Sequence, residues 1–309
     1  MKKTLKTLPL GLAFLFLATI TFAQNVLVDV NKSYPGINRL EVEGGWLDVS
    51  YEGGSGTDVQ VEAYLQSNDE DQDIVFVTVG DVLKIKYERK SKNWTWSNGQ
   101  NKGWIKITGP ESIEINFRNS SGNTSVRNVA SEETYMKVTS GRISAEGIDG
   151  DLTIGATSGR LSVSDVSGSV MASLTSGNAD INQVSGDVNY KSTSGSLDAS
   201  QIDGELNVEF TSGRAVLESI GQLGELKFTS GSIRAEEVGL GPNTSFSGSS
   251  GNFRIQTYSN LEDFNFDLSS SSGSLQVGDR KTSKKLEVDN GADAWIKGRI
   301  TSGSISIEN

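Results

Sequence analysis

The fold of this chain is decided by residues 139–177, which read TSGRISAEGIDGDLTIGATSGRLSVSDVSGSVMASLTSG. The tripeptide Thr-Ser-Gly opens this stretch and returns at a constant interval. Six copies keep this spacing without a slip, at 139–141, 157–159, 175–177, 193–195, 211–213 and 229–231. Midway between them lies a second set of glycines, at Gly150, Gly168, Gly186 and Gly204. The repeating unit is therefore a nine-residue arm, and two arms make one coil of about 18 residues.

Apolar and polar residues alternate within each arm, which is the period of a β-strand. The seventh position after each Thr-Ser-Gly glycine is always β-branched: Ile148, Val166, Val184, Ile202, Ile220 and Val238. If successive coils stack about 4.8 Å apart, each such position forms a column inside a narrow core. The sequence therefore predicts an all-β chain that folds as a β-solenoid.

Glycine and proline support this prediction. A coil turns sharply after each short strand, so we expect the glycines of both sets to supply positive φ at the turns. No proline lies between residues 111 and 241, as expected if every backbone N–H in this stretch joins a parallel ladder.

Residues 24–118 share the composition of the repeats but not their clean period. Alternating stretches at 40–50, 59–65 and 82–87 predict strands, and polar stretches at 67–73 and 90–102 follow them. Because an exposed solenoid end needs a cap, we interpret 24–118 as a β-rich N-terminal cap with irregular coils. The repeat region then covers 119–309, with its regular part at 139–238. A separate sandwich domain is the alternative for 24–118.

Residues 1–23 have the pattern of a signal peptide. A basic start with Lys2, Lys3 and Lys6 precedes an apolar run at 8–20, and Thr-Phe-Ala at 21–23 fits a cleavage site. The apolar run is too short for a membrane span, which needs about 20 residues. We therefore expect export to the periplasm, the cell surface or the medium, without membrane insertion.

Composition excludes several classes of function. The chain of 309 residues has no cysteine and no histidine, which excludes disulfides, thiolate nucleophiles, Cys/His zinc sites and His-dependent triads. Its net charge is −11, and without residues 1–23 it has 25 Lys+Arg against 39 Asp+Glu. This charge argues against nucleic acid as a partner. No cofactor is expected.

The Thr-Ser-Gly arms at 139–238 and the strand pair at 40–49 resemble a family of bacterial secreted β-strand-repeat proteins labelled putative adhesins. They are also similar to the related head-GIN domains of putative autotransporter-type adhesins. The resemblance covers roughly residues 37–309. It implies a right-handed parallel β-helix at the cell envelope and supplies no catalytic residue. The Phe-Ala-Gln ending of the signal is similar to signals of Bacteroidota.

An aromatic cluster breaks the pattern of the chain. Trp94, Trp96 and Trp104 lie within eleven residues, beside three lysines at 90, 92 and 102. On a strand, Trp94 and Trp96 share one face, and the Asn98-Gly99 turn lets Trp104 return across from them. Stacked indoles on a cationic hairpin can bind sugar rings or a peptide. The alternative is a tryptophan clasp that only closes the loop.

Other surface patterns are weaker. A single threonine column favours a corner role, with each threonine bonding its stacked neighbours, over an ice-binding face. The discontinuous acidic column Asp151, Ser169, Asp187, Glu205 and Glu225 does not match a calcium roll, so we expect no metal site. Arg142, Arg160 and Arg214 share one column and Asp180 and Asp198 another, the kind of charged patch that enzymatic β-helices carry.

Two functions remain open from the sequence. The first is a non-catalytic exported surface protein, an adhesin or binding scaffold whose partner is a glycan or a surface protein. The alternative is a carbohydrate-active β-helix enzyme, similar to polysaccharide lyases or hydrolases. The absence of histidine and the plain alternation of the strands favour the first.

Overall fold

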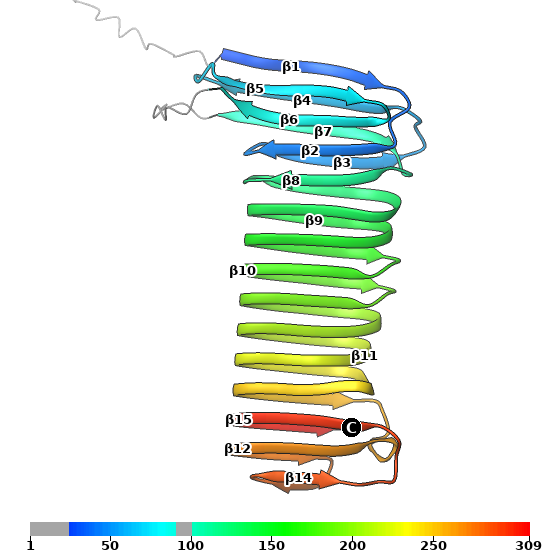
Figure 1. The fold of residues 1–309 in the computed structure, drawn as a ribbon, viewed down its shortest axis with the longest axis vertical. Helices are drawn as coiled ribbons and strands as arrows, with labels where there is room; N and C mark the ends of the chain where they lie inside the picture. Colours follow the sequence, from blue (N-terminus) through cyan, green and yellow to red (C-terminus); the bar gives the residue numbers. More distant parts are fainter. Residues whose placement is uncertain (1–24, 91–100) are drawn as a thin grey trace, which may run out of the picture.

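The structure is a computed structural model that describes residues 25–90 and 101–309. It is all-β apart from one short 3-10 turn, and its strands join in a single sheet that winds into a tall column (Figure 1). The all-β class predicted from the sequence is confirmed. The elements in chain order are β1 (Asn25–Tyr34), β2 (Arg39–Gly45), β3 (Asp48–Gly54), β4 (Val59–Ser67), β5 (Gln72–Val79), β6 (Val82–Arg89), β7 (Lys102–Pro110), β8 (Glu114–Asn119), β9 (Asn123–Val166), β10 (Val170–Val184), β11 (Val188–Thr257), η1 (Leu261–Asp263), β12 (Asn265–Val277), β13 (Arg280–Thr282), β14 (Lys285–Val288) and β15 (Trp295–Glu308).

The strand register follows the sequence repeat. β10 lies between β9 and β11 and is parallel to both. Val184 is the register partner of Val166 on one side and of Ile202 on the other, each exactly one repeat away in the sequence. Stacking of the β-branched column is confirmed for these three residues. All six residues of the column are 0–1% exposed.

Neighbouring columns complement one another in volume. One column reads Leu161, Ala179 and Leu197 along successive strands, and each residue pairs with the next. Two positions after the small Ala179 comes the large Ile181. Two positions after the large Leu197 comes the small Ala199. All of these side chains are buried. A nearly constant volume per coil lets the narrow core pack densely.

The turns correct the prediction for the second glycine set. Gly150 has the expected positive φ, of 134°, but Gly168, Gly186 and Gly204 do not have positive φ. The left-handed position falls three residues earlier, on non-glycine residues with φ of 54–57°: Asp165, Gln183, Gln201, Ser219 and Glu237. A Cβ at Gly168 would lie 2.5 Å from the backbone of Gly150, so close approach of adjacent coils accounts for glycine there. The Thr-Ser-Gly glycines Gly141, Gly159, Gly177, Gly195 and Gly231 do have positive φ, of 125–151°.

The N-terminal strands are hydrogen-bonded directly to the repeats. β8 is parallel to both β2 and β9, and β3 is parallel to both β7 and β9. Beyond these coils, antiparallel pairs form the end of the column, with β4 between β1 and β7 and with β5 beside β6. Strands are present at each position expected in this region.

The C-terminal strands do not stack in sequence order. β15 lies between β11 and β12 and is parallel to both, so Gly303 is the register partner of Gly251 and of Gly273. The short strands β13 and β14 pair antiparallel with β12 (Figure 1).

Candidate functional site: an axial groove

A groove of about 570 Å³ runs along the column across six stacked strand segments, one from β10, four from β11 and one from β15. We call it the axial groove. Its lining residues form two outward rows and a floor between them: Ser173, Leu174, Thr175, Lys191, Ser192, Thr193, Glu209, Phe210, Thr211, Lys227, Phe228, Thr229, Ser247, Gly248, Ser249, Arg299 and Thr301. Strand alternation explains this form, because residues i and i+2 point outward and residue i+1 points inward.

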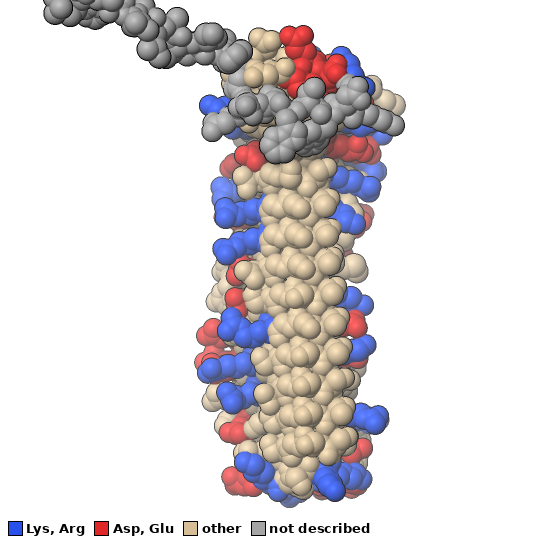
Figure 2. All heavy atoms as spheres, turned by 90° about the vertical axis from the view of Figure 1, so that its left-hand side faces the viewer, with Lys and Arg blue, Asp and Glu red and all other residues tan. Residues whose placement is uncertain are grey.

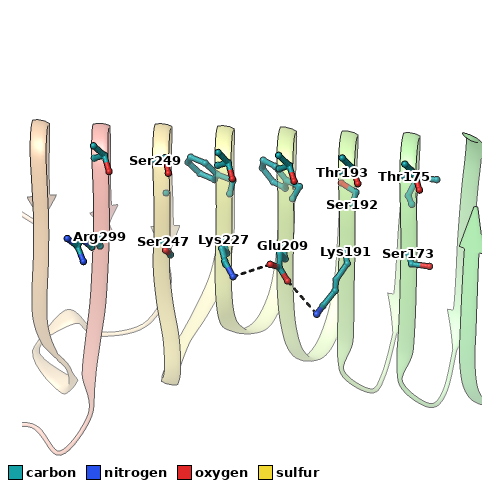
Figure 3. A pocket seen from close by; sticks show the side chains of 17 residues that line it. Ser173, Thr175, Lys191, Ser192, Thr193, Glu209, Lys227, Ser247, Ser249 and Arg299 are labelled. Atoms are coloured by element: carbon teal, nitrogen blue, oxygen red, sulfur yellow. Dashed lines mark ion pairs between the residues drawn. The ribbon is translucent and has the colours of Figure 1, made fainter. Parts of the chain in front are cut away.

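The first outward row carries charge. Figure 3 shows Arg299, Ser247, Lys227, Glu209, Lys191 and Ser173 on successive strands. The Glu209 carboxylate lies 3.4 Å from the Lys191 ammonium and 3.1 Å from the Lys227 ammonium. The hydrogen bond from Lys227 is the largest cause that lowers the pKa of Glu209 below its ordinary value. Arg299 makes no ion pair with any residue in the described ranges.

The second outward row carries hydroxyl groups. Thr175, Thr193, Thr211 and Thr229 are exposed, and Ser249 and Thr301 continue the row. The structure corrects the expectation that these threonines bond their stacked neighbours, because no hydrogen bond joins them in the described chain. Figure 2 shows an uncharged stripe along the column, with charged side chains on both sides of it.

The floor of the groove is apolar and uneven. Leu174, Phe210 and Phe228 are each 3% exposed, and the two phenylalanine rings stack with centroids 5.6 Å apart. Ser192 occupies the equivalent position on the strand between Leu174 and Phe210 and leaves a notch there. The nearby Tyr190 hydroxyl is buried and has no well-aligned hydrogen-bond partner among the described residues. Burial raises the pKa of Tyr190, and the Ser192 hydroxyl partly offsets this rise.

The groove is absent from the predictions made from the sequence. Its signal was present, since Lys191, Glu209 and Lys227 recur with the Thr-Ser-Gly repeat, two positions before each threonine. The charged row becomes complete only with Arg299, whose strand β15 comes beside β11 in the folded chain.

The acidic residues singled out in the sequence lie elsewhere. Asp180 and Asp198 are register partners on β10 and β11, but they do not line the axial groove. Asp151 accepts a hydrogen bond from the backbone N–H of Ser169 at 2.8 Å, and Asp187 accepts one from Glu205 at 2.7 Å. Part of the acidic column therefore joins adjacent coils. Within 25–90 and 101–309, no group of three or more acidic side chains is placed to hold a metal ion.

The tryptophans are only partly placed. Trp94 and Trp96 lie outside the described residues. Trp104 is half-buried on β7, where its ring stacks on that of Tyr64 with centroids 6.1 Å apart and an interplanar angle of 20°. The Lys106 ammonium lies 4.7 Å from the centroid of the Trp104 ring. In the described parts of the chain, no helix is long and apolar enough to cross a membrane.

Three solved bacterial proteins illustrate what this chain is similar to. A "putative lipid binding protein" from Parabacteroides distasonis is 13% identical with a TM-score of 0.39, over 91% of this chain and 97% of that one. A "putative adhesin" from Parabacteroides merdae is 11% identical with a TM-score of 0.39, over 91% and 96% of the two chains. A "putative cell adhesion protein" from Clostridium sporogenes is 11% identical with a TM-score of 0.22, over 91% and 99%. These values are too low to carry an argument about the ligand.

No curated protein matches the chain. A family model, described as Toastrack DUF4097, matches residues 37–218 and again 204–308. The two matches together span most of the chain.

Proposed function

The chain belongs to the Toastrack DUF4097 family, and on this premise we propose that it is an exported, non-catalytic binding protein of the cell envelope. Its ligand is an extended chain that lies along the axial groove. A glycan fits this role because the groove combines exposed hydroxyl groups, charged side chains and an apolar floor, which are the contacts that sugar rings make.

One observation carries this proposal: the groove is open and linear. It crosses six stacked coils, and each of them contributes one hydroxyl residue to the same row. Enzyme sites instead bring a few different polar groups together around one reacting atom. A repeating surface suits a repeating ligand, and the regular stack of coils presents the contacts in fixed backbone positions, which reduces the entropic cost of binding.

The proposal includes an architecture. We propose a right-handed parallel β-solenoid with 18-residue coils of two nine-residue arms, a signal peptide at 1–23, an N-terminal cap at 24–118 and the repeats at 119–309. The constant register across β9, β10 and β11 supports the coil length. The antiparallel strands β1, β4 and β5 support a cap at the N-terminal end.

A second contact region is proposed at Trp94, Trp96 and Trp104. The stacked pair of Trp104 and Tyr64, with Lys106 against the indole, supports a cationic aromatic surface on β7. The role of Trp94 and Trp96 remains a prediction from the sequence.

A glycan and cell-surface binding screen tests the proposed function. Thr193→Trp places a bulky ring at the rim of the groove and should abolish binding. Asp203→Trp introduces the same ring at an exposed corner outside the groove and should leave binding intact. Equal binding by the two variants would refute the groove as the site. The formation of new reducing ends or unsaturated sugars, lost on substitution of Asp180 or Asp198, would show an enzyme instead.

A further inference from the structure

The alternation of charge along the axial groove identifies a class of ligand. We propose that the groove binds a linear acidic polysaccharide that carries one anionic group on every second sugar. This inference rests on the proposed binding function and adds the chemistry of the ligand.

The cations of the groove occupy every second strand. Lys191, Lys227 and Arg299 are separated by the strands that carry Glu209 and Ser247 (Figure 3). Three positive charges and one negative charge make this row locally cationic, on a protein with a net charge of −11. Such a local reversal of sign attracts an anionic ligand.

The spacing of these cations matches a disaccharide. Lys191 and Lys227 converge on the Glu209 carboxylate, so their ammonium groups lie closer together than their backbone positions. Strands in a sheet lie about 4.8 Å apart, so the backbone positions that carry the cations, on every second strand, lie about 10 Å apart. Two rings of an extended sugar chain cover about the same length. An anionic group on alternate sugars therefore meets a cation each time, and the sugar between them lies opposite Glu209 or Ser247.

Glu209 makes the alternation selective. Its carboxylate pairs with both lysines and so holds their ammonium groups along the row. It would also repel an anion placed on the intervening sugar. A polymer with a carboxylate on every sugar places one of them against the Glu209 carboxylate, and the two repel. A nucleic acid strand, with a phosphate on every nucleotide, places a phosphate there with the same effect.

The other row supplies contacts for the neutral parts of a sugar chain. The Thr193, Thr211 and Thr229 hydroxyls are exposed and have no hydrogen bond to one another in the described structure. They can donate to and accept from sugar hydroxyls on the opposite side of the groove. The notch at Ser192 offers space for a ring substituent of the sugar between Leu174 and Phe210.

Titration calorimetry at low salt with three probes tests the inference. Hyaluronan oligosaccharides carry a carboxylate on alternate sugars, polygalacturonate oligosaccharides carry one on each sugar, and cellohexaose carries none. We expect hyaluronan to bind most tightly and to weaken at high salt. Substituting Lys191, Lys227 and Arg299 together by alanine should weaken hyaluronan binding about 10-fold or more. Glu209→Gln should raise affinity for polygalacturonate.

The matched control removes Arg142, Arg160 and Arg214, three exposed cations at positions outside the groove. This control variant should bind hyaluronan as tightly as the unmodified protein does. Thermal melts of all variants check that each one is folded. Tighter binding of polygalacturonate than of hyaluronan, or equal loss in the control variant, would overturn the inference. If only cellohexaose binds and Thr193→Trp abolishes this binding, the inference about an acidic ligand is overturned. The proposed binding function of the groove then still stands. If no probe binds and Thr193→Trp changes no binding in the cell-surface screen, both fail.

Discussion

At the scale of single residues, inward and outward positions of one strand differ sharply in what they tolerate. Ile202 is 1% exposed and stacks on Val184, whereas its neighbour Asp203 is exposed. Burial of an aliphatic side chain such as that of Ile202 contributes about 1.5–3 kcal/mol to the free energy of unfolding. An unpaired carboxylate buried at the same place removes this contribution and adds a larger cost of its own.

Ile202→Asp should therefore prevent soluble folding or lower the melting temperature steeply. Asp203→Asn should be nearly silent, because it changes an exposed side chain outside the core. Circular dichroism melts of the two variants check this, and comparable melting temperatures would contradict the register.

Buried tyrosines add a dependence on pH. Burial raises the pKa of Tyr34, Tyr51, Tyr87 and Tyr190 in the folded protein. In the unfolded chain these phenols lose their proton near pH 10. Above about that pH the unfolded state has released more protons than the folded state, so the free energy of unfolding falls as pH rises.

Tyr190→Phe should shift this alkaline loss of stability to higher pH. At pH 7 the change should cost little, because the Tyr190 hydroxyl has no well-aligned partner to lose among the described residues. Tyr258→Phe, at a residue that is 64% exposed, serves as the control. Melting temperatures between pH 8 and 11 measure the effect, and identical pH profiles for Tyr190→Phe and the control would rule it out.

At the scale of elements, the corners between arms determine how closely coils approach. A Cβ at Gly177 would lie 1.9 Å from the carbonyl oxygen of Gly159, and the φ of Gly177 is +134°. The adjacent coil leaves no room for a side chain at this corner. At Gly54, a Cβ would meet nothing within 4 Å.

Gly177→Ala should thus destabilise the protein by about 2–3 kcal/mol through strain and displacement of the adjacent coil. Gly54→Ala should be neutral or slightly stabilising, because it restricts only the unfolded chain. Urea unfolding of both variants checks the contrast. Equal midpoints would show that the corners do not need glycine.

The opposite corners contain the reverse case, a side chain where glycine fits better. Gln183 is exposed with a φ of 55°, a conformation that costs a non-glycine residue about 1 kcal/mol or more. Gln183→Gly should leave the melting temperature unchanged or raise it. Met171→Gly, in the extended part of the same strand, should lower stability by about 1 kcal/mol. A loss at Gln183 as large as that at Met171 would argue against strain at this corner.

At the scale of the whole molecule, one coil cannot bury its apolar face by itself. Each strand of the repeats pairs with one strand above and one below, so stability is the sum of coils and of the interfaces between them. The same stacking converts single outward residues into rows, and the axial groove is a property of the stack rather than of any one coil.

The sequence by itself determined the all-β class, the register of β10 with β9 and β11, and the burial of the six β-branched residues from Ile148 to Val238. It could do so because each coil repeats the same local pattern, and stacking identical patterns leaves one consistent register. Tertiary structure decided the order of the last strands and the site. Arg299 lies beside Ser247, which is distant in the sequence, because β15 inserts between β11 and β12. No local pattern encodes that insertion, since it depends on which free strand edge the returning chain covers.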